Sequence, residues 1–529
     1  MADQTRPLGA QISHMLKDRG VDVIFGIPGV HNQEMYRGIE EAGITHVLAR
    51  HEQGAGFMAD GYARATGRPG VAYVITGPGL CNIMTPMGQA YSDSVPMLVI
   101  SSCLDETAAR RGQLHQMKDQ RAAAETVCDW SHEARSAEAT YALINRAFME
   151  FHTARPRPKH VQVPIALLEG QAPAHDLKDM GSSDGVEQMG DLLPVLSLMI
   201  RQAKRPLFVF GGGARDATPE IRNLLARCPV PVFTTYAGRG IVAPDYPFLF
   251  GSMLARPESA ATAAEADLVI TVGSELSEVD LWRNHLGHSG KMVRIDTDPE
   301  ALAESAGNGM RFKAAAHTIF RHLEKEENLP DSFEWTEREV KAARARWRAE
   351  VDAEYPGVLP VADALKACLP DGTMIYSDMT QFAYAAKEVW DMDEPGHWHH
   401  PYGFGTLGYA LPAAIGGQVG RPGKPTMAIM GDYGFHYTMP ELGVAVELGL
   451  PIPIILWDNG KLGAIEASMV GAQIAPNAVI ARNPDFVKLA EAFGAAAVKP
   501  GSLDEMQAAV QQAFSAAGPT LIHVTPDIA

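Results

Sequence analysis

Short runs of apolar and β-branched residues alternate with longer helical patterns along the whole chain. The runs are apolar throughout, which is typical of strands that are buried on both faces of a parallel sheet. Because strand and helix patterns alternate to the end of the chain, the sequence predicts an α/β architecture. The predicted strands are Val21–Ile27, Val71–Thr76, Met97–Ser101, Pro206–Phe210, Asp267–Val272, Lys291–Ile295, Thr373–Ser377, Thr426–Met430, Ile452–Trp457 and Thr520–Val524.

Two breaks in this alternation predict three domains. The stretch Glu169–Met189 is rich in Gly, Ser, Pro and Asp and lacks periodicity, so it is predicted to be a linker. The stretch Glu324–Glu354 is highly charged and is predicted to be an exposed helix that leads into the next domain. We therefore expect three doubly wound parallel-sheet domains, over residues 1–175, 190–330 and 355–529. The first and last could share a fold, although the sequence shows no clear internal repeat.

Composition and charge narrow the classes of partner. The formal net charge of −18 argues against nucleic acid or an acidic membrane surface, but a local positive site could still bind a small anion. The five cysteines form no CxxC pair, which fits a reducing cytoplasm. The N-terminus does not resemble a signal peptide, and no apolar run reaches the roughly 20 residues needed to span a bilayer. We expect a cytoplasmic protein without a membrane partner.

The last third of the chain has two polar turns, and each directly follows a predicted strand. Gly431–Gly434 follows one strand, a helix is predicted over Thr438–Leu448, and Asp458–Gly463 follows the next strand. The carboxyl ends of neighbouring parallel strands are where open α/β sheets bind ligands. Asp432 and Asn459 would supply oxygen ligands there that suit Mg²⁺ holding a diphosphate. Taken alone, the pattern also fits an ordinary βαβ turn pair.

Glu52 stands where a predicted strand gives way to a helix. The strand ends near Arg50, and small residues through Ala49–Gly67 would let the helix pack closely against its neighbours. An acid in the first turn of a helix is favoured by the helix dipole, which would by itself explain Glu52.

Together these stretches resemble the binding motif for thiamine diphosphate (ThDP), in which Gly-Asp-Gly precedes Asn-Asn by some two dozen residues. Tyr433 and Asp458 depart from that motif. Order and spacing along nearly the whole chain resemble the acetolactate synthase branch of the ThDP-dependent 2-oxo acid decarboxylase superfamily. The resemblance implies pyrimidine-binding, central Rossmann-like and diphosphate-binding domains. It also implies Mg²⁺ ligands, namely Asp432, Asn459 and the backbone oxygen of Lys461.

The resemblance further implies which residues hold the cofactor. Glu52 would hydrogen-bond the pyrimidine ring from a poorly solvated pocket and so activate ThDP. The carbonyl of Gly405 would accept from the aminopyrimidine, and Leu407 would bend the cofactor, although simple core packing could also explain Leu407. The full implied set is Gly29, Glu52, Pro78, Asn82, Thr380, Gln381, Gly405, Leu407, Gly431, Asp432, Tyr433, Gly434, Asn459, Leu462 and Gly463.

The middle of the chain gives a weaker signal for a nucleotide. Some relatives bind FAD or ADP in the central domain, and many bind nothing there. The stretch Pro206–Gly213 ends in FGGG rather than GxGxxG, so FAD is a minor alternative here. A flavin-dependent oxidase is the corresponding alternative function.

Few residues bear on the substrate, which we expect to be a small 2-oxo acid. His31, His115 and Gln116 align with active-site positions of the family, and Gln116 is similar to the acetolactate synthases; solvated loop residues would also fit. Several stretches, among them WDNGKLGAI, resemble the 5-guanidino-2-oxopentanoate decarboxylases most. Glu466 could then face a guanidinium group, or could be a plain exposed acid.

The predicted activity is therefore ThDP- and Mg²⁺-dependent decarboxylation of a 2-oxo acid to an aldehyde. A carboligase of the acetolactate synthase type and a catalytically silent ThDP-fold protein with a regulatory or assembly role are the alternatives. The resemblance implies that Glu52 and the metal loop come from different chains. We therefore expect a homodimer or homotetramer with active sites at the subunit interface.

Overall fold

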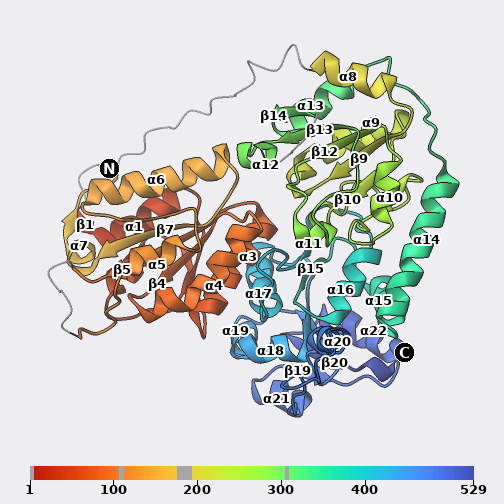
Figure 1. The fold of residues 1–529 in the computed structure, drawn as a ribbon. Helices are drawn as coiled ribbons and strands as arrows, with labels where there is room; N and C mark the ends of the chain where they lie inside the picture. The colour runs from red at the N-terminus through yellow and green to blue at the C-terminus, as the bar shows by residue number, and fades with distance from the viewer. Residues whose placement is uncertain (1–4, 106–111, 176–192, 304–308, 529) are drawn as a thin grey trace. The chain divides into compact units, whose positions relative to one another are not determined.

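The computed structural model describes residues 5–105, 112–175, 193–303 and 309–528 and contains three parallel β-sheets (Figure 1). The chain divides into two compact units. The first comprises Met1–Gly181, Thr373–Thr380 and His400–Ile528, and the second comprises Ser182–Gly372 and Gln381–His399. Every predicted strand is present, with ends that differ by a few residues. The last 14 residues of the predicted linker lie outside the described residues.

The first sheet has the strand order β3-β2-β4-β5-β7-β6, with all neighbours parallel. Its strands are β2 (Val23–Gly26), β3 (Thr45–Leu48), β4 (Gly70–Val74), β5 (Met97–Cys103), β6 (Trp130–Glu133) and β7 (Lys159–Pro164). Its helices are α1 (Leu8–Asp18), α2 (Gln33–Glu41), α3 (Glu52–Thr66), α4 (Pro78–Ser92), α5 (Gln120–Glu125), α6 (Ala137–Thr153) and α7 (Ile165–Glu169). The short strands β1 (Arg6–Pro7) and β8 (Gln171–Ala172) pair antiparallel.

Both faces of this sheet are covered, as the wholly apolar strands require. In β4, Val71 and Tyr73 pack into a core with α1, α2 and α6, whereas Ala72 and Val74 pack into a second core with α3 and α4. Successive side chains of a strand point to opposite faces, so a strand between two helical layers has no polar side.

The last sheet repeats the arrangement of the first. The strands of this sheet that belong to the first unit lie in the order β15-β17-β18-β20-β19, and they are β15 (Met374–Ser377), β17 (Thr426–Gly431), β18 (Pro453–Trp457), β19 (Ala496–Val498) and β20 (Thr520–Val524). This order matches β2-β4-β5-β7-β6 position by position, which reveals the shared fold. Its helices are α17 (Ala410–Gly420), α18 (Asp432–Thr438), α19 (Leu442–Glu447), α20 (Gly463–Gly471), α21 (Phe486–Ala492) and α22 (Leu503–Ala513).

Helices α3 and α17 join the two sheets of the first unit through close backbone contact. A Cβ at Gly61 would lie 1.9 Å from the carbonyl oxygen of Ala413, and one at Gly416 would lie 1.9 Å from that of Met58. Only glycine allows the two helix backbones to come this near. The small residues of α3 therefore serve the tight packing that the sequence predicted.

The second unit contains a Rossmann-like sheet. Its order, β11-β10-β9-β12-β13-β14, corresponds to 3-2-1-4-5-6, with all neighbours parallel. The strands are β9 (Pro206–Phe210), β10 (Val232–Thr234), β11 (Leu249–Gly251), β12 (Leu268–Val272), β13 (Lys291–Asp296) and β14 (Met310–Lys313). The helices are α8 (Leu193–Gln202), α9 (Thr218–Arg227), α10 (Ser259–Ala264), α11 (Glu278–Leu281), α12 (Pro299–Ala303), α13 (Ala316–Leu323), α14 (Glu337–Glu354), α15 (Val358–Cys368) and α16 (Gln381–Val389).

The charged stretch before residue 355 corrects one prediction. Helix α14 begins at Glu337, where Thr336 and Glu339 form a capping box, and not at Glu324. The helix is not simply exposed, because Val340, Trp347 and Val351 are buried. A few well-spaced apolar residues are enough to bury one face of a charged helix.

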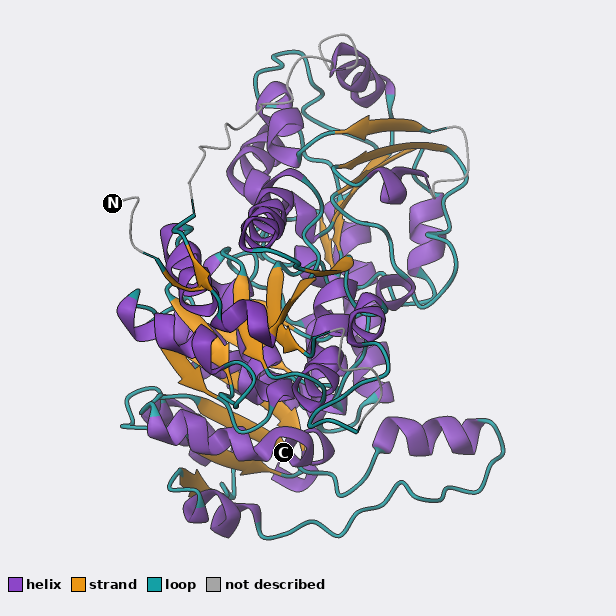
Figure 2. Cartoon of the chain, turned by 90° about the vertical axis from the view of Figure 1, so that its left-hand side faces the viewer, coloured by secondary structure: helices purple, strands orange, loops and turns teal. Residues whose placement is uncertain are grey.

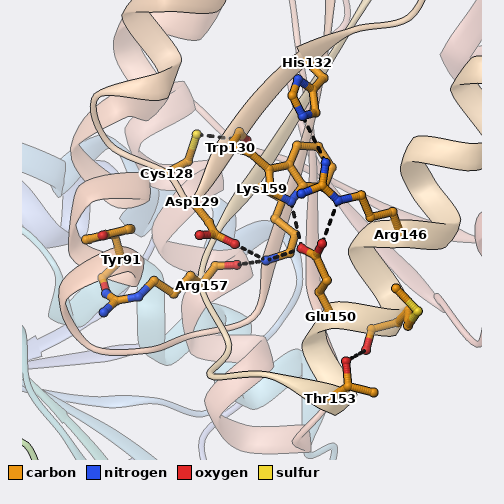
Figure 3. A network of polar contacts seen from close by, with 11 residues as sticks. Tyr91, Cys128, Asp129, Trp130, His132, Arg146, Glu150, Thr153, Arg157 and Lys159 are labelled. Atoms are coloured by element: carbon orange, nitrogen blue, oxygen red, sulfur yellow. Dashed lines mark hydrogen bonds and ion pairs between the residues drawn. The ribbon is translucent and has the colours of Figure 1, made fainter. Parts of the chain in front are cut away.

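An ion cluster around the buried Lys159 lies at the edge of the first sheet (Figure 3). The Nζ of Lys159, which is 1% exposed, lies 2.9 Å from Asp129 Oδ2 and 3.3 Å from Glu150 Oε2. Trp130 Nε1 and Arg146 Nε also donate to Glu150, at 2.8 and 2.6 Å. The cluster sits at the amino ends of β6 and β7, opposite the edge where such sheets bind ligands. We therefore assign it a stabilising role.

No helix of the described residues is long and apolar enough to cross a membrane.

Candidate cofactor site

Glu52 is the first residue of α3, at the carboxyl end of β3. His51 caps the helix by accepting a hydrogen bond from Gln53 N, at 3.1 Å. Asn82 Nδ2, from α4, donates to Glu52 Oε2 at 2.9 Å, and Glu52 is 8% exposed. Within the described residues, Asn82 is its one hydrogen-bond partner. A Cβ at Gly79 would lie 3.4 Å from the other oxygen, Oε1. That oxygen can still accept a proton or a hydrogen bond.

A residue of the last third of the chain, Glu441, holds the turn that precedes Glu52. Glu441 accepts hydrogen bonds from Arg50 N at 3.1 Å and from His51 N at 2.9 Å. Its carboxylate fills the space beside Gly54, where a Cβ would lie 2.2 Å from Oε1. Burial raises the pKa of Glu441 to about 7, although the two backbone N–H donors favour its charged form. Two carboxyl groups, of Glu441 and Glu52, therefore stand near the start of α3.

The Gly-rich turns of the first third lie at the carboxyl ends of β2 and β4, the switch point of this sheet. Gly29 N donates to Asn32 Oδ1 at 2.8 Å. Gly77 N donates to the buried Gln120 Oε1, also at 2.8 Å. Pro78 follows as the first residue of α4, the helix that carries Asn82. The predicted cofactor turns are thus rigidly held by side chains outside the predicted set.

His31 and His115 meet across these turns. Their rings are 4.9 Å apart between centroids, in an edge-to-face arrangement. Burial, and then the neighbouring His115, lower the pKa of His31. Gln116 follows His115, but its Oε1 accepts from Gly112 N at 3.0 Å and so caps its own loop. The two histidine rings therefore lie against each other, whereas the side chain of Gln116 is held within its own loop.

The predicted diphosphate half of the site lies at the carboxyl ends of β17 and β18, which pair in parallel as predicted. Helix α18 begins at Asp432, so Asp432, Tyr433 and Gly434 form its first turn rather than the predicted loop. The helix predicted over Thr438–Leu448 is not continuous, because α18 ends at Thr438, a 3-10 turn spans Met439–Glu441 and α19 then begins at Leu442. Pro440 lacks the N–H that a continuous α-helix would need.

Asp378 ties together the segments around this half. Its carboxylate is fully buried and accepts from Met379 N and Gly408 N, both at 2.8 Å. A Cβ at Gly434 would lie 2.6 Å from its Oδ2. Burial raises the pKa of Asp378 to about 7, against backbone hydrogen bonds that include those from Tyr409 and Ala410. One side chain thus holds the start of α17 beside the first turn of α18.

The other residues that were predicted to contact this part of the cofactor lie in the loop before α17 and around the start of α16. Gly405, in the left-handed region with a φ of 66°, and the half-buried Leu407 are in the loop before α17. Thr380 is buried and faces Gly431, where a Cβ would lie 3.2 Å from the threonine Cβ. Gln381 begins α16 in the other unit.

Asp458, which departs from the family motif, has partners of its own. His523 Nε2 lies 2.8 Å from its Oδ2, and Asn483 Nδ2 donates to its Oδ1, also at 2.8 Å. Burial would raise the pKa of Asp458, but these hydrogen bonds outweigh it and lower the pKa below its ordinary value. Asn483 Nδ2 also donates to Asp432 Oδ2 at 2.7 Å. The two carboxylates therefore lie beside each other.

The predicted metal loop, residues 458–463, runs through Asn459 to the start of α20. Asn459 Oδ1 accepts from Lys461 N at 3.2 Å. Leu462 N donates to Val479 O at 2.8 Å, and Gly463 begins α20 and is buried. Lys461 Nζ lies 2.6 Å from Glu466 Oε2, so Glu466 already has a cationic partner.

The oxygen atoms at this edge fit a hard divalent cation. No three His, Cys, Asp or Glu side chains among the described residues are arranged to hold a metal. A cation here would therefore combine the Asp432 carboxylate with Asn459, the backbone oxygen of Lys461 and ligand oxygens, as Mg²⁺ commonly does. The first turn of α18 adds the partial positive charge that a diphosphate needs.

Comparison with known proteins places this geometry in a family. The N-terminal, central and C-terminal domains of thiamine pyrophosphate enzymes match residues 6–123, 196–323 and 378–524. A probable 2-ketoarginine decarboxylase of Pseudomonas aeruginosa is 40% identical over 98% of this chain and 94% of that protein. The chain belongs to the thiamine pyrophosphate enzymes. It is thus an enzyme of the family that uses ThDP, the same compound as thiamine pyrophosphate.

Acetolactate synthases are more distant members of the same family. The isozyme 2 large subunit of Escherichia coli is 29% identical over 98% of this chain and 95% of that protein. The mitochondrial catalytic subunit of Saccharomyces cerevisiae is 28% identical over 98% of this chain and 80% of that protein. Carboligases are therefore present among the relatives.

Three residues of this thiamine pyrophosphate enzyme were missed in the sequence: Glu441, Asp378 and Asn483. Asp378 directly follows a predicted strand, at the edge where the other candidates lie, so its position was a usable signal. Glu441 and Asn483 follow no strand and belong to no Gly-rich turn. Their contacts lie 391 and 51 residues away along the chain, and the sequence carries no local sign of them.

Proposed function

We propose that this enzyme uses ThDP and Mg²⁺ to decarboxylate a 2-oxo acid with a guanidino tail, 5-guanidino-2-oxopentanoate (2-ketoarginine), to an aldehyde and CO₂. The observation that carries the proposal is the 40% identity, over nearly both whole chains, to a probable 2-ketoarginine decarboxylase. FAD has no part in the proposal, because the turn after β9 lacks the GxGxxG pattern.

Different residues of the chain have different roles in the proposed reaction. Bound ThDP supplies the carbanion and the electron sink for loss of CO₂. Glu52 holds and moves the proton at the pyrimidine ring, with its carboxyl oriented by Asn82. His31 and His115 lie near the Gly-rich turns at the carboxyl ends of β2 and β4. Burial favours the uncharged form of His31. We assign them to proton control around the 2-oxo acid.

The substrate tail is assigned to Glu466. An arginine-like guanidinium can bind a carboxylate through two parallel hydrogen bonds, which a lysine ammonium cannot do. In the free protein Lys461 occupies Glu466 at 2.6 Å. A guanidinium substrate would replace Lys461 at that carboxylate, so Glu466 has a cationic partner before binding and after it.

The substrate assignment is tested by comparing 5-guanidino-2-oxopentanoate with 2-oxohexanoate, a 2-oxo acid whose tail carries no charge. With ThDP and Mg²⁺ present, CO₂ and aldehyde are both measured. We expect Glu466→Gln to lower kcat/KM for the guanidino acid by about tenfold or more, with little change for 2-oxohexanoate. Equal losses on both acids would refute the role of Glu466 in tail recognition.

Carboligation is the second candidate, because the acetolactate synthases are relatives. Incubation with pyruvate alone separates the two functions. Acetolactate as the main product would contradict simple decarboxylation. Aldehyde from the guanidino acid, in amounts equal to the CO₂ released, would support it.

We also propose that two chains are needed for each active site. Helix α20 and the segment after it form an arm that stands clear of the sheet (Figure 2). Large apolar side chains are exposed on it, among them Val470 at 59%, Ile474 at 52% and Ile480 at 75%. Apolar surface of this kind marks an interaction site. A second copy of the chain is the proposed partner, in a homodimer or a homotetramer of two such dimers.

Complementation tests the shared site. Glu52→Gln should lower kcat by at least about a hundredfold, and Asp432→Ala should abolish Mg²⁺-dependent activity. If each site takes Glu52 from one chain and Asp432 from the other, a mixed dimer of the two variants keeps one intact site. Refolding the variants together should then restore up to roughly a quarter of wild-type activity. No recovery in a verified mixed dimer would exclude a shared site.

A further inference from the structure

The side-chain amide of Asn483 lies between the carboxylates of Asp432 and Asp458. Its Nδ2 donates to Asp432 Oδ2 at 2.7 Å and to Asp458 Oδ1 at 2.8 Å. Its Oδ1 lies 3.3 Å from His436 Nε2. Because the two carboxylates only accept, the NH₂ group of Asn483 faces them, and the amide oxygen then accepts from His436 Nε2.

This arrangement suits an amide better than any charged side chain. Asp432 and Asp458 stand at the ends of adjacent strands, and their charges repel each other. One NH₂ group carries two hydrogens and can satisfy one oxygen of each acid. His523 holds the other oxygen of Asp458, at 2.8 Å, so that acid cannot turn away. The Asp432 carboxylate is therefore held by Asn483 together with the backbone N–H groups of Tyr433 and Asp432.

Asn483 reaches this place on the chain segment that returns from the α20 arm. Val479 O accepts from Leu462 N at 2.8 Å, and Ala481 N donates to Gly460 O at 3.3 Å. An antiparallel bridge joins Lys461 to Ile480. The returning segment is thus paired residue by residue with the metal loop, and Asn483 is the point where it contacts the acids.

We propose that Asn483 is a positioning residue of the metal centre. It orients Asp432 for the divalent cation and links the return of the α20 arm to cation binding. The proposal rests on the metal site of the proposed function. Partners that orient metal ligands are commonly worth 10–100-fold in metal affinity, which sets the size of the expected effect.

The test measures Mg²⁺ affinity of the full-length protein with ThDP present, by titration of tryptophan fluorescence, and repeats it with Mn²⁺ by electron paramagnetic resonance. Asn483→Leu keeps the branched shape of the side chain and removes the hydrogen bonds, and Asn483→Ala is the second variant. Both should bind either cation about 10–100-fold more weakly than wild type. Asn477→Ala is the matched control, since Asn477 is exposed on the same arm and its side chain donates to Ala475 O within its own turn.

Two further readouts separate positioning from a general loss of structure. At saturating Mg²⁺ the kcat of both variants should return towards wild type, because Asn483 is not assigned to the substrate. Hydrogen exchange in residues 458–463 and 479–485 should be faster in both variants than in wild type without metal.

The outcomes distinguish this proposal from the proposed function. Cation affinity of Asn483→Leu within twofold of wild type, with unchanged hydrogen exchange, would overturn the role of Asn483 alone. Wild-type protein that binds neither Mg²⁺ nor Mn²⁺ with ThDP present would overturn the metal site itself and, with it, this proposal.

Discussion

Among single residues, Glu441 makes the turn before Glu52 sensitive to pH. Burial raises its pKa from 4.5 to about 7. Between these values the folded protein keeps a proton that the unfolded chain releases, so stability decreases as the pH rises through this window. Glu441→Gln removes the titrating group. Its melting temperature should therefore fall less than that of wild type between about pH 5 and pH 7.5.

The control is Glu491→Gln, at an exposed helix position, which should keep the wild-type pH dependence. A parallel pH dependence of Glu441→Gln and wild type would show that Glu441 is not the group responsible.

Among structural elements, the loop before α17 depends on Asp378. Its carboxylate accepts from Gly408 N, with further backbone donors at Tyr409 and Ala410. In Asp378→Asn one oxygen becomes an NH₂ group that faces these N–H donors. We expect faster hydrogen exchange at residues 408–410 and about tenfold weaker ThDP binding. The exposed Asp371→Asn should leave both unchanged. Normal ThDP affinity in Asp378→Asn would show that the loop is held without this carboxylate.

The contact between α3 and α17 gives a prediction at the same scale. Gly61→Ala would place a Cβ 1.9 Å from the carbonyl oxygen of Ala413, so the helices must move apart. Overpacking of this kind costs about 1–3 kcal/mol, which should lower the melting temperature. Gly518→Ala, with no atom within 4 Å of the new Cβ, serves as the control. Equal melting temperatures would mean that the helices can separate without cost.

For the whole molecule, the exposed arm predicts how activity depends on assembly. Val470→Asp puts a charge on a side chain that is 59% exposed in the single chain but buried in the proposed dimer. We expect this variant to sediment as a smaller species and to lose activity on dilution, because a charge without a partner is costly in an apolar interface. Its melting temperature, measured where wild type is also dissociated, should be unchanged. A fully assembled Val470→Asp protein would place the interface elsewhere.

The sequence by itself determined the elements and the edge of the sheet where the candidate residues gather. Wholly apolar runs indicated strands buried on both faces, and the structure confirms all of them. Asp432 and Asn459 follow adjacent parallel strands, so strand order alone places them at the same edge of the sheet. The roles of Glu52, His31 and Glu466 stay predictions until the experiments above are done.

Only the tertiary structure decided which remote side chains support those residues. Asn483, Glu441 and Asp378 act through contacts between segments whose spacing along the chain has no period. The buried face of α14 and the repeated strand order of the first and last sheets were equally invisible in the sequence. Local patterns report whether a segment is buried, because burial selects apolar residues at a fixed period. They do not report which distant segment covers it, since that depends on how the sheets and helices pack.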